Sequence, residues 1–168
     1  MIARILLTFG LALGLASCDD STAQVSPKQA EAIQAVQALP NNSKDYPQPN
    51  TTYLSFDPGH GYQVTFMRGD NVSWLWYPGN QRSLPASWKV EATRNAICWK
   101  YGSRTYNPVT KQGGGQFNCS PLGLVQRTKV AALKGDVFNL SSGQIPYRRK
   151  KCDAPSEFSF DQSAYRCR

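Results

Sequence analysis

The cysteines are the residues of this 168-residue chain best suited to covalent chemistry, and there are five of them. Four follow residue 50, at Cys98, Cys119, Cys152 and Cys167. None of these has the Cys-x-x-Cys spacing typical of zinc sites, so we expect neither a metal ion nor another cofactor. Four cysteines allow three disulfide pairings. Because short loops close at the lowest entropic cost, proximity favours Cys98–Cys119 and Cys152–Cys167, each worth about 3 kcal/mol.

Candidate catalytic residues are few. The sole histidine, His60, closes the run Asp57-Pro58-Gly59-His60, which is equally typical of a turn. The carboxylates after residue 50 form no recognisable acid–base pair, and no Gly-x-Ser-x-Gly elbow is present in the sequence. Residues 113–115 are three glycines without the following Lys-Ser/Thr of a phosphate loop, so we expect a flexible loop tip there. We therefore predict no catalytic residue and no enzyme activity.

Basic residues dominate the second part of the chain. Residues 51–168 hold sixteen Lys and Arg against seven Asp and Glu, whereas residues 18–50 hold two against four. The long polar loop 102–115 and the cluster 148–151 are the candidate ligand-binding segments. Their candidate residues are Arg104, Tyr106, Asn107, Lys111, Arg148, Arg149, Lys150 and Lys151. Such a surface suits an anionic glycan, a lipid head group or an envelope protein rather than nucleic acid. The alternative is a solvated basic surface without a partner.

The first residues indicate export. Arg4 precedes an uncharged run over 5–17, which is shorter than the roughly 20 residues that a membrane-spanning helix needs. The run ends in Leu15-Ala16-Ser17-Cys18, which resembles the lipobox of bacterial lipoproteins. This resemblance implies a signal peptide at 1–17, a lipid on Cys18, and a location in the cell envelope facing the periplasm or exterior. The alternative is ordinary cleavage near Ala16, which leaves Cys18 as a free thiol.

Residues 18–50 are predicted to be a tether between the lipid anchor and the folded domain. They are poor in aromatic residues and rich in Ala, Gln, Asn, Ser and Pro. Ser26 and Pro27 form a helix start, and apolar residues recur at every third position up to Leu39. We expect a short, loosely held helix near 27–39, followed by a linker up to residue 50.

Residues 51–168 are predicted to form one disulfide-bonded β domain. Apolar and polar residues alternate with period two in short runs separated by turn residues, which is typical of antiparallel strands. The expected strands are 51–56, 62–66, 72–76, 87–92, 96–101, 116–119 and 136–140, with one or two helical turns within 123–134. The fold class is therefore mostly β, a meander that closes as a barrel or sandwich.

The aromatic residues of this domain have two possible roles. In the run 72–77, Trp74 and Trp76 alternate with Leu75 and Tyr77, so the two pairs face opposite sides of the sheet. We expect the tryptophans to belong to the core. The opposite side is then the better candidate for an aromatic surface on which sugar rings or peptides stack.

A second resemblance covers residues 86–140. It depends on Trp88-Lys89-Val90, the run Ala96-Ile97-Cys98-Trp99-Lys100-Tyr101, Cys119 and Gly135-Asp136-Val137-Phe138. This order is similar to a family of small exported β proteins of alphaproteobacteria that are uncharacterised, and it implies a fold but no activity. The expected function is a non-enzymatic envelope lipoprotein, acting as a binding or structural module. The alternatives are an inhibitor or protective factor acting on a wall-degrading enzyme through loop 102–115, and an unrecognised hydrolase.

Overall fold

The computed structural model describes residues 26–167, and its main element is one seven-stranded antiparallel sheet. The strand order is β8-β5-β4-β3-β2-β1-β9, so β1 to β5 follow one another as a meander. The strands are β1 (Thr51–Asp57), β2 (Gly61–Met67), β3 (Val72–Trp76), β4 (Leu84–Glu91), β5 (Ala96–Tyr101), β8 (Asn118–Pro121) and β9 (Lys129–Lys134). No helix in this described part is long and apolar enough to cross a membrane.

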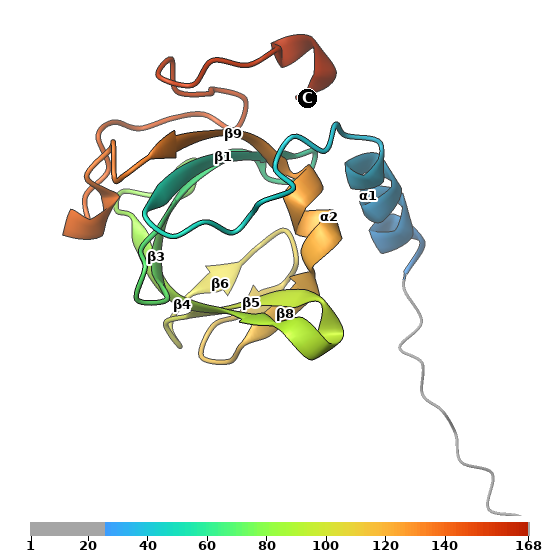
Figure 1. Cartoon of the computed structure of the whole chain (residues 1–168), viewed down its shortest axis with the longest axis horizontal. Coiled ribbons are helices and arrows are strands. Elements are labelled where there is room, and N and C mark those ends of the chain that lie inside the picture. Colours follow the sequence, from blue (N-terminus) through green and yellow to red (C-terminus); the bar gives the residue numbers. More distant parts are fainter. Residues whose placement is uncertain (1–25, 168) are drawn as a thin grey trace, which may run out of the picture.

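The sheet curls into a half-barrel whose two edge strands, β8 and β9, do not pair with each other. Figure 1 looks into this curl, with β1 and β9 at the top, β4, β5 and β8 at the bottom, and the short helix α2 (Leu122–Arg127) between β8 and β9. The Leu122 N–H donates to the Asn95 carbonyl at 2.8 Å, and the Phe56 N–H donates to the Thr128 carbonyl at 2.7 Å. These bonds attach both ends of α2 to the sheet. The predicted mostly β fold, an antiparallel meander, is thus confirmed, and it takes the form of a half-barrel.

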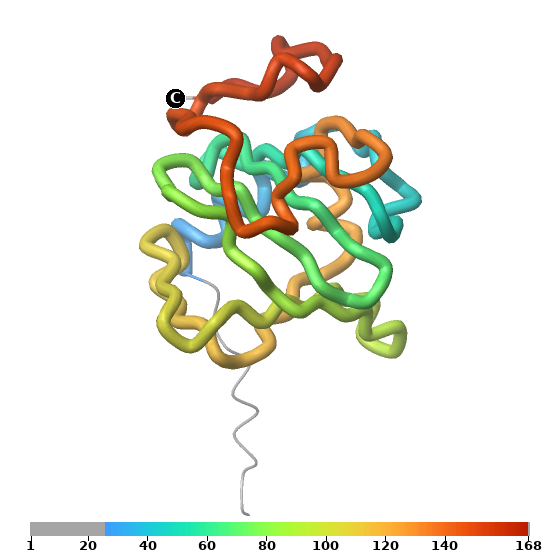
Figure 2. The backbone as a smooth tube through the Cα atoms, turned by 90° about the vertical axis from the view of Figure 1, so that its left-hand side faces the viewer, coloured from blue at the N-terminus to red at the C-terminus, as the bar shows by residue number. Residues whose placement is uncertain are grey.

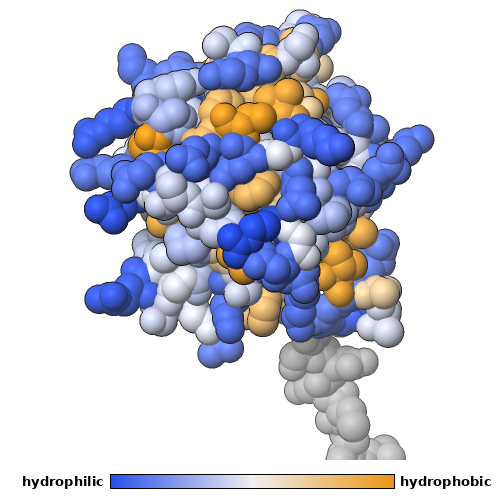
Figure 3. All heavy atoms as spheres, turned by 60° about the vertical axis from the view of Figure 1, so that its left-hand side comes forward, coloured by the Kyte–Doolittle hydropathy of each residue, from blue (hydrophilic) through white to orange (hydrophobic). Residues whose placement is uncertain are grey.

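The outer side of β1, β2 and β3 carries the larger core. Trp74 and Trp76 alternate with Ser73 and Leu75, and both tryptophans are buried on this side, as predicted. The C-terminal segment supplies the other half of the core, through Phe138, Leu140, Phe158 and Tyr165. In Figure 2 this segment, coloured orange to red, crosses in front of the green strands and continues along the top of the view. The face drawn in Figure 3 is mainly hydrophilic, with hydrophobic residues gathered in several areas.

The inner side of the sheet holds a second, smaller core near α2. It consists of Tyr53, Met67, Trp88 and Ile97, together with Tyr46 from the segment before β1. The Tyr46 ring meets the Tyr53 ring edge-on, with 4.9 Å between centroids. Tyr46 therefore fills this end of the curled sheet, and we call this side chain the plug.

The segment predicted to be a loose tether is packed onto the domain over its described part. Helix α1 spans Pro27–Gln37, and the Ser26 hydroxyl accepts a hydrogen bond from the Gln29 N–H at 3.3 Å, so the expected helix start is present. However, Leu39 is buried in the outer core, and Arg127 of α2 donates to the Leu39 carbonyl at 3.1 Å. Within α1 itself only Val36 is buried, so the helix is attached to the domain near its C-terminal end, and the expectation that it is loosely held stays a prediction.

Two further elements differ from the sequence-based prediction. Residues 136–140 form no strand, because the Asp136 carboxylate accepts from the N–H groups of Leu140 and Ser141 and fixes a turn. The ambiguous run 123–134 divides into α2 and strand β9, and β9 pairs with β1. Short apolar runs do not by themselves distinguish a helix from a strand. Here residues 129–134 become a strand because they pair with the edge of β1.

Both disulfides predicted from proximity are present, Cys98–Cys119 and Cys152–Cys167. Cys98 and Cys119 are directly opposite in the β5–β8 pair, so this bond fixes the edge strand to the sheet. The second bond closes a loop in the C-terminal segment.

Truncating the Tyr46 side chain should lower the stability of the folded protein. Tyr46→Ala removes a side chain that is only 4% exposed and should lower the free energy of unfolding by about 3 kcal/mol. Tyr106→Ala is the matched control, because that ring is 63% exposed and its loss should change stability by less than about 0.5 kcal/mol. Urea denaturation of the oxidised protein measures both. Equal effects would contradict a packed 26–50 segment.

Candidate functional site

The inner side of the sheet is hollow at the end away from α2. A cavity of about 930 Å³ lies there, among the inward-facing residues of β2 to β8. Rings and side-chain amides line it: Tyr77, Trp99, Tyr101, Tyr106, Gln63, Asn80, Gln81, Asn107, Gln112 and Asn118. Two cationic residues, Arg82 and Arg104, also line it. Aromatic rings beside a few oriented polar groups are the usual lining of a small-molecule site.

A hairpin formed by residues 102–115 covers part of the cavity. Its two short strands are β6 (Tyr106–Asn107) and β7 (Gln112–Gly113), and β6 lies inside the ring of strands in Figure 1. The expected flexible tip at 113–115 is instead the tightly packed base of this hairpin. The Gly114 N–H donates to Thr105, the Gly115 N–H donates to Tyr101, and a Cβ on Gly114 would lie 2.1 Å from the Gly102 carbonyl oxygen. The backbone approach therefore requires glycine.

The structure gathers several predicted binding residues at this cavity. Arg104, Tyr106 and Asn107 line it, whereas Lys111 of the same hairpin does not. Leu75 and Tyr77, opposite the buried tryptophans, also line it. Gln63, Trp99 and Asn118 were not predicted as site residues. The alternation of residues along each strand could have placed them on the same side of the sheet as Leu75. Alternation does not say, however, which side of the sheet borders a cavity.

The turn between β1 and β2 holds an ion pair at the edge of the site. His60 Nδ1 is 2.9 Å from Asp57 Oδ2, and the other ring nitrogen is 3.4 Å from Asn107 Oδ1 of the hairpin. Burial favours neutral forms of both groups, but the hydrogen bond and charge between them outweigh it. The pKa of His60 is therefore raised and that of Asp57 is lowered. The His60 ring also meets the Tyr77 ring edge-on, with 5.8 Å between centroids.

A lysine lies in the wall between the cavity and the plug. Lys129 Nζ donates to Ser55 Oγ at 2.8 Å and lies 4.6 Å from the centre of the Tyr46 ring. Burial lowers the pKa of Lys129 to about 7, against a smaller opposing effect of Asp57. A hydroxyl beside a weakly basic amine is a pair used in acyl transfer. Neither Ser55 nor Lys129 lines the cavity, so we assign the pair a structural role.

The predicted basic cluster divides into exposed and buried members. Arg148 and Lys150 are exposed and Lys151 is half-buried. Arg149 is 5% exposed, lies 4.5 Å from the Trp76 ring centre, and donates to the carbonyls of Trp76 and Asp153. Burial lowers the pKa of Arg149 to about 10, so it remains protonated at neutral pH. Its contacts hold the C-terminal segment on the sheet rather than present a donor to a ligand.

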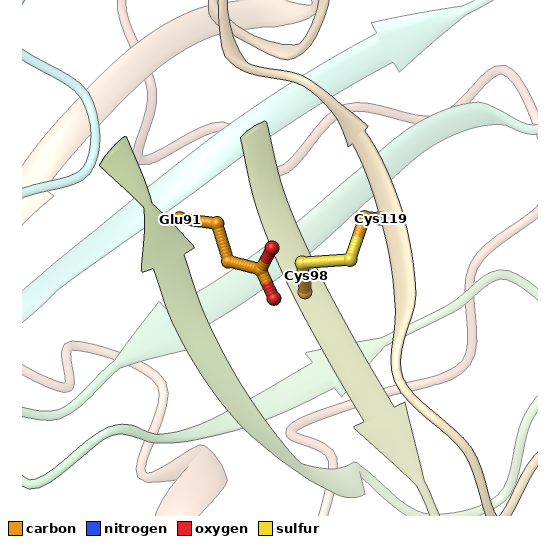
Figure 4. A group of neighbouring side chains, drawn as sticks. All are labelled: Glu91, Cys98 and Cys119. Atoms are coloured by element: carbon orange, nitrogen blue, oxygen red, sulfur yellow. A yellow bond between two sulfur atoms is a disulfide. The ribbon is translucent and has the colours of Figure 1, made fainter. Parts of the chain in front are cut away.

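One group of side chains has the composition of a metal site. Glu91, Cys98 and Cys119 place their ligand atoms within 4.8 Å of one another (Figure 4). However, the two sulfur atoms are bonded to each other, and the Glu91 carboxylate pairs with Lys89 and Arg94. Because a metal needs a thiolate, the oxidised group does not provide a donor set.

Comparisons with protein-family models, curated proteins and solved structures return no match. The signal peptide at 1–17 and the lipidation site Cys18 lie outside the described residues. Both resemblances noted in the sequence therefore stay predictions.

The buried Lys129 should make stability depend on pH. Between its pKa of about 7 in the folded protein and the ordinary value near 10.5, the unfolded chain binds more protons, so stability should rise with pH. Lys129→Met should remove much of this rise between pH 7 and 9. The exposed Lys134 of the same strand provides the control, since Lys134→Met should follow the wild-type curve. Urea denaturation at each pH measures the effect, and parallel curves for Lys129→Met and wild type would contradict it.

Proposed function

We propose that this protein is a non-enzymatic binding module of the cell envelope, and that its cavity takes a saccharide carrying a negative charge. The observation that carries the proposal is the lining of the cavity, where aromatic rings, side-chain amides and two arginines converge. Rings stack on the apolar faces of sugars, amides hydrogen-bond to hydroxyl groups, and arginine binds carboxylate or phosphate.

Two further features support a preformed site. The hairpin that carries Arg104 and Tyr106 is anchored at its base by the Cys98–Cys119 bond and by backbone hydrogen bonds. Tyr101 lines the cavity, and its phenol, whose pKa burial raises to about 12, is a hydrogen-bond donor at neutral pH like that of any tyrosine. A rigid lining loses little conformational entropy when a ligand binds.

A second candidate function uses exposed side chains of the same hairpin. Tyr106 and Val109 are 63% and 45% exposed, and the base of the hairpin is hydrogen-bonded to β5, which favours insertion into another protein. An inhibitor of a wall-degrading enzyme would bind in this way.

Calorimetric titration with a uronic-acid oligosaccharide and its carboxyl-reduced neutral counterpart tests the cavity. We expect tighter binding of the acidic form. Arg104→Gln should weaken that form about tenfold and the neutral form little, because it removes a charge-assisted hydrogen bond. Tyr106→Ala should weaken both about fivefold through lost stacking.

Lys111→Gln is the matched control, since it removes one charge from the same hairpin outside the cavity. An equal loss of affinity in Lys111→Gln, or no heat with either sugar, would reject the saccharide proposal. Binding of a wall-degrading enzyme that Tyr106→Ala abolishes would instead favour the inhibitor.

The envelope location has its own test. Expressed in a bacterial host, the protein should be recovered from membranes with acylated Cys18 as its first residue, as mass spectrometry would show. Cys18→Ser should abolish acylation, whereas Ser17→Ala keeps a small residue before the cysteine and should preserve it. A full-length chain with a free Cys18 thiol would contradict the proposal.

A further inference from the structure

A smaller hollow of about 260 Å³ adjoins the cavity and shares Tyr77 and Pro78 with it. We call it the basic hollow. Its residues are His60, Tyr77, Pro78, Gly79, Arg149, Lys150 and Lys151. They come from the β1–β2 turn, the β3–β4 connection and the C-terminal segment, so the fold brings together groups that are distant in the sequence.

The C-terminal segment is fixed where it borders the basic hollow. The Tyr62 N–H donates to the Lys151 carbonyl at 2.9 Å, at the start of β2. The preceding residue, Gly61, has φ +71°, and a Cβ there would lie 2.2 Å from the same carbonyl oxygen. Arg149 donates to the Trp76 carbonyl at 2.9 Å, and Cys152 is bonded to Cys167. The backbone that carries Lys150 and Lys151 is thus held against β2 and β3.

Within residues 26–167, the lining of the basic hollow carries positive charge and no carboxylate. Two neighbouring acids have partners of their own: Asp57 pairs with His60, and Asp153 accepts from the Lys150 backbone N–H at 3.0 Å. Arg149 donates to carbonyls and contributes mainly its charge. The Lys150 ammonium, the Tyr77 hydroxyl and a protonated His60 are donors that can meet an anion, and Lys151 adds its positive charge.

The size of the basic hollow limits what it can hold. Ligand pockets are usually roughly 300–1,000 Å³, so this hollow suits a charged group rather than a whole ligand. We propose that the basic hollow is an oxyanion subsite, which binds a phosphate or carboxylate group of the ligand whose rings occupy the cavity. The link to a cavity ligand rests on the proposed function, whereas anion binding itself does not.

His60 can serve as an NMR probe of this subsite, because it lines the hollow and its resonance is that of the only histidine in the sequence. The groups that face it are Asp57 from its own turn, Tyr77 after β3, Asn107 from the hairpin and Lys151 from the C-terminal segment. A bound anion favours the protonated imidazole, so it should raise the pKa of His60. By linkage, binding should weaken as the pH rises through that pKa.

Titration of the His60 resonance by NMR, with and without inorganic phosphate, tests the subsite. Phosphate should raise the midpoint in the wild-type protein. The double variant Lys150→Gln with Lys151→Gln should weaken phosphate binding about tenfold, because it removes two positive charges from the lining of the hollow. The control, Lys28→Gln with Lys134→Gln, changes the same net charge at exposed positions elsewhere and should weaken it less than about twofold.

A titration midpoint of His60 that phosphate does not move, or equal losses of phosphate affinity in the two double variants, would overturn the subsite.

Calorimetry with a sugar phosphate and its unphosphorylated sugar then tests the link to the cavity. Loss of the phosphate-dependent gain in the Lys150/Lys151 variant supports a shared ligand. Phosphate binding without any sugar binding would reject the proposed function but leave the anion site. Binding only to vesicles containing phosphatidylglycerol would identify a lipid head group and overturn the shared ligand.

Discussion

The closure of one curled sheet through helix α2 is the constraint on which the rest of this structure depends. In the described part of the chain only the short helix α2 packs on the inner side of the sheet, so the inward-facing residues away from α2 must either pack against one another or leave a cavity. Helix α2 connects the edge strands β8 and β9, and backbone hydrogen bonds at its ends attach it to Asn95 before β5 and to Phe56 of β1. The inner side then becomes a partly open pocket, with Tyr46 filling one end and the hairpin 102–115 partly covering the other.

This division of the inner space explains why buried polar groups occur in a small domain. Lys129 is tolerated between plug and cavity because it has the Ser55 hydroxyl and the Tyr46 ring as partners, and because burial shifts its pKa toward the neutral form. Asp57 and His60 are similarly paired at the rim. Polar residues along one side of β1 and β2 are therefore consistent with a site in which polar ligand groups replace water.

The C-terminal segment has two roles that follow from the same contacts. It covers the outer core through Phe138, Leu140 and Phe158, and the buried Arg149 attaches it to the Trp76 carbonyl. The same attachment brings Lys150 and Lys151 beside His60 and Tyr77. In this run of four basic residues three line the hollow, and one of them, Arg149, is buried and also attaches the segment to the sheet, a distinction that charge counting does not make.

The sequence by itself determined the β class, the hairpins of β1 to β5 and the two disulfide pairings, because alternation, turn residues and loop closure act over short distances along the chain. It also indicated Arg104, Tyr106 and Asn107. Only the tertiary structure decided that 129–134 is a strand, that Tyr46 is a plug, and that Gly114 forms the base of a hairpin. These outcomes depend on partners distant in the sequence: Lys129 and Ser55, for example, are 74 residues apart. Local patterns do not encode which distant surfaces will meet, and the packing of the whole chain settles it.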